Sequence, residues 1–143
     1  MAAPFSCQLR VQFYHTDAQG RVFYAHFFAF LEQARCAFWE ALGFDEATVR
    51  QIEQETVVVH LEADYLGPAA FYDLLRVEVS VEALGKSSLR LGYRIAQARS
   101  GEEIFRARTV LVQIDPTTAR ARPWSEAFRQ AILAHCSPQG GQA

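Results

Sequence analysis

A single carboxylate, Asp17, lies between a predicted strand and the start of a predicted apolar helix. The first backbone N–H groups of a helix have no partner within it and carry a partial positive charge, so they can hold an oxyanion. An aspartate beside them can attack a carbonyl carbon or activate a water molecule, and these two parts suffice for acyl transfer. Thr16 and Asp17 are also residue types that complete turn and cap hydrogen bonds, and on the residues alone this structural role is favoured over catalysis.

The spacing of apolar residues predicts the elements that position this segment. Apolar and polar residues alternate over residues 8–13, which is typical of a half-buried strand, and a loop is expected over 15–20. Apolar side chains then recur every three to four residues over 26–42, which predicts a long helix ended by Gly43. Asp45 is placed to cap a shorter helix.

The rest of the chain has the pattern of strands. We expect strands over residues 57–65, 75–82, 88–95 and 104–114, tight turns at Gly85-Lys86 and Ser100-Gly101, a last helix over 125–136 and a frayed end at Gly140-Gly141. One apolar helix can bury its face only against a sheet long enough to curl round it. The sequence therefore predicts an α+β layout with the sheet wrapped on the helix.

Composition limits the classes of function. The 143 residues are 50% hydrophobic and 21% charged, which is typical of one globular domain, here 1–143. The net charge of −2 argues against non-specific nucleic-acid binding, and no apolar run is long enough to cross a membrane. Residues 1–5 have no export pattern. Cys7, Cys36 and Cys136 form neither a disulfide framework nor a zinc pattern, so we expect a cytoplasmic protein without metal.

Motifs of the segment around Asp17 carry a family resemblance. The string from Tyr14 to Ala25, YHTDAQGRVFYA, resembles the active-site signature D-T-D-A-x-G-x-V-[YW]-[HF]-x-x-Y of the 4-hydroxybenzoyl-CoA thioesterase type of hotdog protein. Downstream, DYLGPA at residues 64–69 with Asp73 is similar to the family's E-Y-x-x-P-A…D pattern. Asp115-Pro116 with Arg122-Pro123 is similar to its D-P…R-P tail. The resemblance covers residues 8–130, the expected domain core.

This resemblance implies a fold, an assembly and an activity. The expected hotdog fold has a five-stranded antiparallel sheet round a long central helix, here with a short C-terminal helix. The family implies a homodimer with sheets joined edge to edge, or a homotetramer of such dimers, with active sites at the subunit interface. It implies hydrolysis of an aromatic or short-chain acyl-CoA thioester, a small-molecule substrate, without a cofactor. Asp17 aligns with the catalytic carboxylate and the backbone N–H near Tyr24 with the oxyanion donor.

Several positions near Asp17 are expected to contact the acyl group. His15 stands where many relatives carry Asp or Glu, Tyr24 replaces a common His, and Phe27 replaces the usual Tyr. With Phe23 these residues favour an apolar or aromatic acyl group. The expected substrate contacts are His15, Gly20, Phe23 and Phe27, with His60 and Asp64 facing the same cleft from the partner subunit.

The phosphates of coenzyme A need positive charge, and charge is uneven along the chain. Residues 1–85 carry 5 basic and 12 acidic side chains, whereas residues 86–143 carry 9 basic and 4 acidic ones. Arginine presents forked donors that suit phosphate oxygens, although these side chains suit a solvated strand face equally well. The expected coenzyme A contacts are Arg90, Arg94, Arg106, Arg108, Arg120 and Arg122.

Two other functions compete with thioester hydrolysis. A hotdog dehydratase or hydratase usually carries a His followed by a Pro-Gly loop before the helix, and His26 has no such neighbour. A non-catalytic module that binds acyl-CoA or another small ligand would explain the phenylalanines and the basic half without Asp17.

Overall fold

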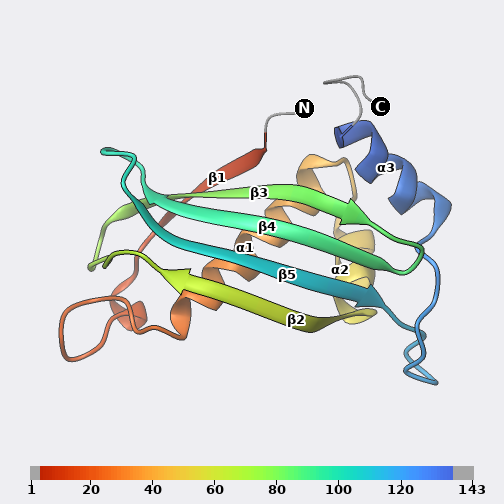
Figure 1. The fold of residues 1–143 in the computed structure, drawn as a ribbon, viewed down its shortest axis with the longest axis horizontal. Helices are drawn as coiled ribbons and strands as arrows, with labels where there is room; N and C mark the ends of the chain where they lie inside the picture. The colour runs from red at the N-terminus through yellow and green to blue at the C-terminus, as the bar shows by residue number, and fades with distance from the viewer. Residues whose placement is uncertain (1–3, 137–143) are drawn as a thin grey trace.

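Five antiparallel strands form one curved sheet that wraps round a long helix (Figure 1). The computed structural model describes residues 4–136. Its sheet has the order β1-β3-β4-β5-β2, so β1 and β2 are the two edges. The elements are β1 (Phe5–Arg10), the 3-10 turn η1 (Phe13–His15), α1 (His26–Ala41), α2 (Glu46–Gln54), β2 (Thr56–Tyr65), β3 (Leu74–Leu84), β4 (Ser88–Gln97), β5 (Glu103–Gln113) and α3 (Glu126–Cys136). This is the predicted hotdog fold.

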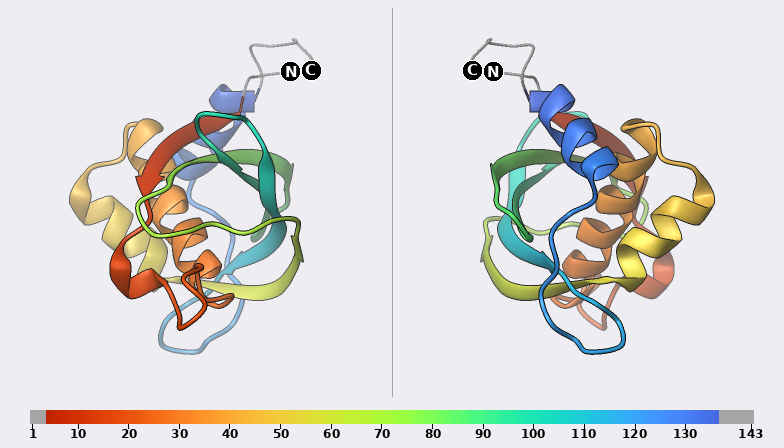
Figure 2. Two further views of the ribbon diagram at one scale, coloured as in Figure 1. Left: turned by 90° about the vertical axis from the view of Figure 1, so that its left-hand side faces the viewer. Right: turned by 90° about the vertical axis from the view of Figure 1, so that its right-hand side faces the viewer.

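The core lies between α1 and the concave face of the sheet, as the end-on views show (Figure 2). Alternate residues of the strands point inward and are buried, as on β4, where Leu89, Leu91, Tyr93 and Ile95 are at most 1% exposed. The apolar face of α1 meets them with Phe27, Phe30, Leu31, Ala34, Phe38 and Trp39. Because the apolar face of α1 packs against the sheet, the N-terminal end of the helix has a fixed position at one end of the molecule.

The helix predictions are confirmed in detail. The helix α1 ends at Ala41, and Gly43 has the positive φ of +102° that ends many helices. The Asp45 side chain caps α2 by accepting a hydrogen bond from the Thr48 N–H at 2.9 Å. No described helix is long and apolar enough to span a membrane. The expected frayed end at Gly140-Gly141 lies outside the described residues.

The prediction that the first strand continues to Phe13 is wrong. The strand β1 ends at Arg10, and the Val11 N–H donates to the carbonyl of Asp73 rather than continuing the ladder. The chain then tightens into η1, which leaves the Phe13 side chain 75% exposed. The alternation of apolar and polar residues therefore predicted a strand that is too long. An exposed aromatic residue at the end of a strand continues the alternation in the sequence just as a buried one does.

A partly buried ion pair joins α1 to α2. The Arg35 guanidinium donates to both carboxylate oxygens of Glu53, at 2.7 and 3.0 Å, and the Trp39 indole donates to the same carboxylate at 2.7 Å. Burial alone would raise the pKa of Glu53, but the hydrogen bonds from Arg35 and Trp39 outweigh it and lower that pKa. Charged Glu53 thus anchors α2, and with it the start of β2.

Replacing Glu53 with Ala tests this anchor. The substitution leaves Arg35, whose side chain is only 13% exposed, without its partner, so we expect a loss of about 3–5 kcal/mol in the free energy of unfolding. Glu46→Ala is the matched control, because it removes the exposed Arg50–Glu46 pair and should cost no more than about 0.5 kcal/mol. Denaturant unfolding measures both values, and equal losses would contradict the assignment.

Candidate active site

The Asp17 loop, residues 16–22, is a tight turn whose two ends run antiparallel to each other (Figure 1). It lies at the end of the molecule where α1 begins. Thr16 and Val22 form an antiparallel bridge, and within it the Asp17 N–H donates to the Arg21 carbonyl at 2.9 Å. The Gly20 N–H closes the turn on the Asp17 carbonyl at 2.9 Å. Gly20 has a φ of +79°, a conformation that glycine adopts without strain. The predicted substrate residue Gly20 thus shapes the turn that carries Asp17.

The Asp17 carboxylate is held by one oxygen. Its Oδ1 accepts a hydrogen bond from the Gln19 N–H at 2.9 Å, the Asx-turn arrangement typical of aspartate in loops. Its Oδ2 has no hydrogen-bond partner within residues 4–136. The side chain is half-buried. One oxygen therefore orients the carboxylate while the other is available for chemistry.

The Asp17 loop is anchored on both sides. The Val22 N–H donates to the Ala69 carbonyl at 2.8 Å, so the segment after β2 supports the loop from one side. On the other side the Phe23 N–H donates to the carbonyl of His15 at 2.9 Å. The His15 ring is 4% exposed, and burial followed by the proximity of His26 lowers its pKa. The predicted substrate contact His15 therefore lies beneath the loop, inside the protein.

The start of α1 offers free amide groups. Its N-cap residue, Ala25, has no side chain that can cap the helix. The backbone N–H groups of Tyr24, Ala25 and Phe27 find no acceptor in the described part of the chain, whereas the N–H of His26 donates to the Phe23 carbonyl. Unpaired amides at a helix start are an anion site with a partial positive charge. This places donors where the sequence predicted the oxyanion site, beside Tyr24.

Tyr65, a residue that the sequence interpretation did not assign to the site, contacts this helix start. Its hydroxyl donates to the Tyr24 carbonyl at 2.8 Å. The same peptide unit carries the free N–H of Ala25, and a hydrogen bond to its carbonyl polarises that N–H. The signal was present in the E-Y-x-x-P-A-like motif, in which Tyr65 follows Asp64. Tyr65 thus ties the end of β2 to the candidate oxyanion donors.

Aromatic side chains surround the same helix start. Phe23 and Tyr24 are 39% and 65% exposed and lie with their ring centroids 4.7 Å apart. Phe27 is buried and stacks on Phe105 at 4.8 Å, so its ring belongs to the core wall below the site. These exposed rings give the start of α1 an apolar surface.

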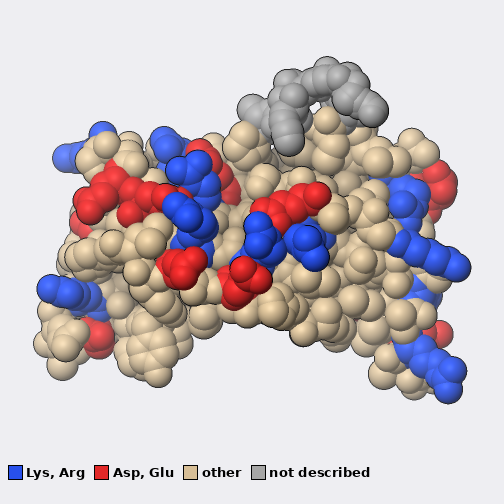
Figure 3. Space-filling view, in the orientation of Figure 1, with Lys and Arg blue, Asp and Glu red and all other residues tan. Residues whose placement is uncertain are grey.

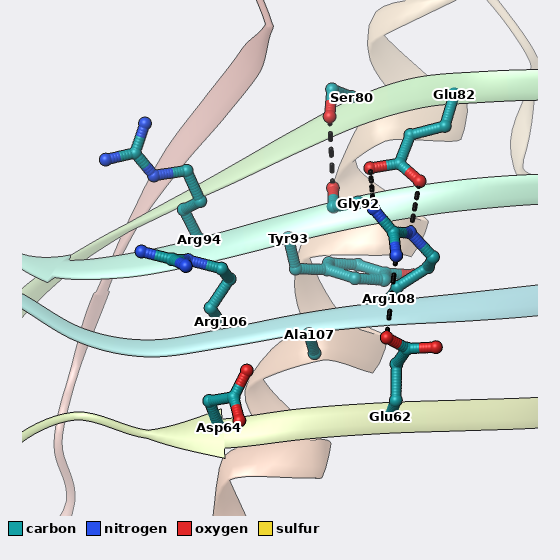
Figure 4. Close-up of a pocket in the computed structure, with 10 residues that line it drawn as sticks. All are labelled: Glu62, Asp64, Ser80, Glu82, Gly92, Tyr93, Arg94, Arg106, Ala107 and Arg108. Carbon is teal, nitrogen blue, oxygen red and sulfur yellow. Dashed lines mark hydrogen bonds and ion pairs between the residues drawn. The ribbon is translucent and has the colours of Figure 1, made fainter.

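The remaining predicted residues of β2 lie on the outer face of the sheet. His60 is exposed and its ring contacts the Glu62 carboxylate at 3.1 Å. Asp64 lies opposite Arg106 in the strand register. Asp64 lines a shallow hollow of about 330 Å³ over Gly92, where the Glu82 carboxylate lies close to the glycine backbone (Figure 4). Within one chain, neither residue is brought to Asp17.

Three of the predicted coenzyme A arginines line this hollow and are already paired. Arg94 and Arg106 both donate to Glu103, each with a 2.8 Å contact. Their hydrogen bonds hold the pKa of Glu103 at about 2. Arg108 donates to Glu82 and lies 3.5 Å from Glu62. Positive and negative side chains therefore alternate across this face (Figure 3).

The other three arginines lie towards the opposite end of the sheet from Asp17. Arg122 forms an ion pair with Glu55. Arg90 and Arg120 have no acidic partner among residues 4–136. Their segments are neighbours, because the Gln113 N–H donates to Ser87 and the Trp124 N–H to Lys86. In the described chain no group of three His, Cys, Asp or Glu side chains is arranged to hold a metal.

The geometry of the Asp17 loop makes a prediction for Gly20→Ala. An alanine at a φ of +79° is strained by about 1–2 kcal/mol, and relief of that strain moves the loop. Gly101 is a matched control because it has the same φ and equally open surroundings in the β4–β5 turn. We expect equal losses of stability in the two variants but, for Gly20→Ala alone, a fall of at least tenfold in the thioester hydrolysis that the family resemblance implies. Equal activities would show that the loop does not position the reaction.

Comparisons with known proteins identify the family of this chain. A model of the thioesterase superfamily matches residues 19–104. The acyl-CoA thioesterase YbgC of Haemophilus influenzae is 34% identical over 92 residues, 64% of this chain and 68% of that protein. The 1,4-dihydroxy-2-naphthoyl-CoA hydrolase of Synechococcus elongatus is 27% identical over 126 residues, 87% and 91% of the two chains. A solved thioesterase from Thermus thermophilus, complexed with coenzyme A and Zn, matches with a TM-score of 0.77 and 31% identity, over 91% and 92%. The chain therefore belongs to the thioesterase superfamily and is a thioester hydrolase.

Proposed function

We propose that this thioesterase hydrolyses aromatic or short-chain acyl-CoA thioesters at the junction of the Asp17 loop and α1, as in the 4-hydroxybenzoyl-CoA type. The observation that carries the proposal is the pairing of two features in one short segment. Asp17 keeps one carboxylate oxygen free, and the amides of Tyr24 and Ala25 are without acceptors in the described structure. A thioester carbonyl bound by those amides presents its carbon to the carboxylate.

Two routes use the same groups. In the first, Asp17 Oδ2 attacks the carbonyl carbon, the C–S bond breaks with release of the coenzyme A thiolate, and water then hydrolyses the resulting anhydride. In the second, Asp17 takes a proton from a water molecule as that water attacks the carbonyl carbon. The tetrahedral intermediate then collapses, the C–S bond breaks, and the leaving coenzyme A thiolate takes up the proton from Asp17 or from solvent. In both routes the carbonyl oxygen of the thioester gains negative charge next to the free amides. These amides stabilise the charged oxygen of the transition state more strongly than the neutral carbonyl oxygen of the substrate.

The preference for an aromatic or short acyl group rests on the rings around the helix start. Phe23 and Tyr24 offer flat, exposed apolar surfaces, whereas the buried Phe27 closes the space beneath them. The Synechococcus elongatus relative is named for a naphthoyl thioester, which is aromatic. The free thiols of Cys7, Cys36 and Cys136 support action in the reducing cytoplasm.

The complete enzyme in this proposal is a homodimer joined along β2, alone or paired into a tetramer. As an edge strand, β2 presents unpaired backbone groups, and native proteins cover or protect such edges. Val57, Val58, Val59 and Leu61 on this strand are 38–57% exposed. Antiparallel pairing of two β2 edges would satisfy the backbone and bury these side chains.

Dimerisation also supplies the coenzyme A site. Within one chain, the segment of Arg120 lies at the start of β2, because the Ile114 N–H donates to Glu55 and the Asp115 N–H to Arg120. The start of α1, next to the Asp17 loop, lies at the other end of β2, where Tyr65 contacts Tyr24 (Figure 1). The strand has ten residues and is thus roughly 30 Å long. A two-fold axis at the middle of β2 exchanges the ends, so the arginine-bearing end of one subunit meets the Asp17 loop of the other. Arg90 and Arg120, which lack acidic partners in the described chain, are the strongest of the six predicted phosphate contacts.

The substitution Asp17→Asn tests the proposed chemistry. Loss of the nucleophile or base should lower kcat/KM by at least about 100-fold, because general-base catalysis alone contributes 10²–10⁴-fold. Thiol release is followed with benzoyl-CoA, a short aliphatic acyl-CoA and palmitoyl-CoA. We expect the wild type to prefer the first two and to act weakly on palmitoyl-CoA.

Asp45→Asn is the control, because Asn caps α2 as Asp does and Asp45 lies far along the chain from the loop. It should retain wild-type kcat/KM. Near-normal activity of Asp17→Asn would remove Asp17 from the chemistry. Binding of the esters without thiol release by the wild type would identify a binding module instead.

The subunit arrangement is tested by Val59→Lys, which places a charge on the exposed edge of β2. We expect the wild type to sediment as a dimer or tetramer, and the variant to shift towards monomer and lose at least tenfold in kcat/KM, because each site needs both subunits. Val59→Thr keeps the β-branched shape and should stay associated. A fully active wild-type monomer, or a fully associated Val59→Lys variant, would contradict the arrangement.

A further inference from the structure

One buried titratable side chain, His15, lies directly beneath the Asp17 loop. Its ring is 4% exposed and packs edge-on against Phe30 of α1 at 4.8 Å. It lies 5.8 Å from the ring of His26, the first residue of α1. The imidazole is therefore a spacer between η1, which leads into the loop, and the first turn of α1.

The hydrogen bonds of His15 define its chemical state. The Gln12 N–H donates to His15 Nδ1 at 2.8 Å, so Nδ1 carries no proton and the ring is the neutral form protonated at Nε2. The His15 carbonyl accepts the Phe23 N–H at 2.9 Å. The ring of His15 thus stabilises the turn before Asp17, and its backbone carbonyl holds the chain just after the Asp17 loop, at Phe23.

We propose that His15 is a positioning residue of the thioesterase reaction: its neutral imidazole holds the Asp17 loop against the start of α1, and protonation of the ring releases that hold. The inference rests on the proposed function of Asp17, to which it adds a residue that acts without touching the substrate. It also predicts that the acid side of the activity profile follows His15.

Protonation is incompatible with the observed contacts. A proton on Nδ1 would face the Gln12 N–H, so an acceptor would become a second donor at 2.8 Å. The new charge would lie near the N-terminus of α1, whose dipole disfavours cations.

The groups that face the ring offer little compensation. They are His26 from α1 and Tyr14 from η1, whose ring centroid is 4.4 Å away. Asp17 is two residues along the chain, and its carboxylate accepts the Gln19 N–H. No ion pair to His15 forms within the described residues.

The direction of the pKa shift of His15 agrees with a ring that is neutral in the folded protein. Burial, and then His26, lower the pKa of His15 below its usual 6.5. The folded state therefore binds fewer protons at this site than the unfolded state does. The contribution of the neutral ring to the stability of the folded protein is therefore fully present above about pH 6.5, the unfolded-state pKa. It is lost as the pH falls through the lower pKa of the folded state.

Two substitutions of His15 distinguish its role as a hydrogen-bond acceptor from the effect of its protonation. In His15→Asn the amide Oδ1 can take the place of Nδ1 as acceptor but cannot gain a proton in this range. We expect kcat/KM at pH 8 within about threefold of wild type and an acid limb displaced to lower pH. In His15→Leu the acceptor is gone, and we expect a loss of roughly 10–100-fold, mainly in kcat, because a small displacement of a reacting group has effects of this size.

His135→Asn is the matched control. Burial also lowers the pKa of His135, but this residue packs against Phe38 at the far end of α1. The control should keep the wild-type pH profile, which excludes a general effect of histidine protonation on folding.

A readout independent of turnover is the ¹⁵N spectrum of the His15 ring with amide exchange at Gln12 and Phe23. We expect an unprotonated Nδ1 at neutral pH, and faster exchange of both amides as the ring titrates. A protonated Nδ1 at neutral pH would overturn the inference. So would an unchanged acid limb in His15→Asn, or wild-type kcat and pH profile in His15→Leu. A wild type that hydrolyses no acyl-CoA would instead refute the proposed function, whatever the ring spectrum shows.

Discussion

The proposed chemistry depends on backbone amides at the start of α1 that have no acceptor among residues 4–136, those of Tyr24, Ala25 and Phe27. Ala25, at the N-cap, has no side chain that could accept the Phe27 N–H, whereas α2 is capped by Asp45. A capping residue at this position would add about 1 kcal/mol of stability. In the proposed mechanism this stability cost leaves partial positive charge beside the negative charge of the transition state.

The surrounding fold keeps that helix start rigid and accessible. The apolar face of α1 is enclosed by the sheet, so the helix cannot shift along its axis without disturbing the core. Tyr65 binds the Tyr24 carbonyl from β2, and the Ala69 carbonyl holds Val22 in the Asp17 loop. The candidate site therefore joins three segments distant in sequence, although the groups proposed for its chemistry lie within residues 17–25.

Most of the fold could be predicted from the sequence, which also singled out the candidate site, and that site stays a prediction. The change from two-residue to 3.6-residue spacing located α1, and Gly43 and Asp45 marked its end and the next cap. Contacts that depend on strand register could not be predicted: the pairing of Arg94 and Arg106 with Glu103 follows from β4 and β5 lying side by side. The burial of His15 could not be predicted either. No periodic pattern in the sequence marks the end of β1 at Arg10 or the turn η1, which together determine where His15 lies.

A crystal structure with a non-hydrolysable thioether analogue of benzoyl-CoA that keeps the benzoyl carbonyl would show where the reacting carbonyl binds. We expect the analogue's carbonyl oxygen to lie about 2.7–3.1 Å from the backbone nitrogen of Tyr24 or Ala25. We also expect Asp17 Oδ2 to lie within about 3.5 Å of the carbonyl carbon or of a water molecule beside it. An acyl carbonyl bound elsewhere, with those amides facing solvent and Asp17 turned away, would refute the proposed roles of Asp17 and the amides.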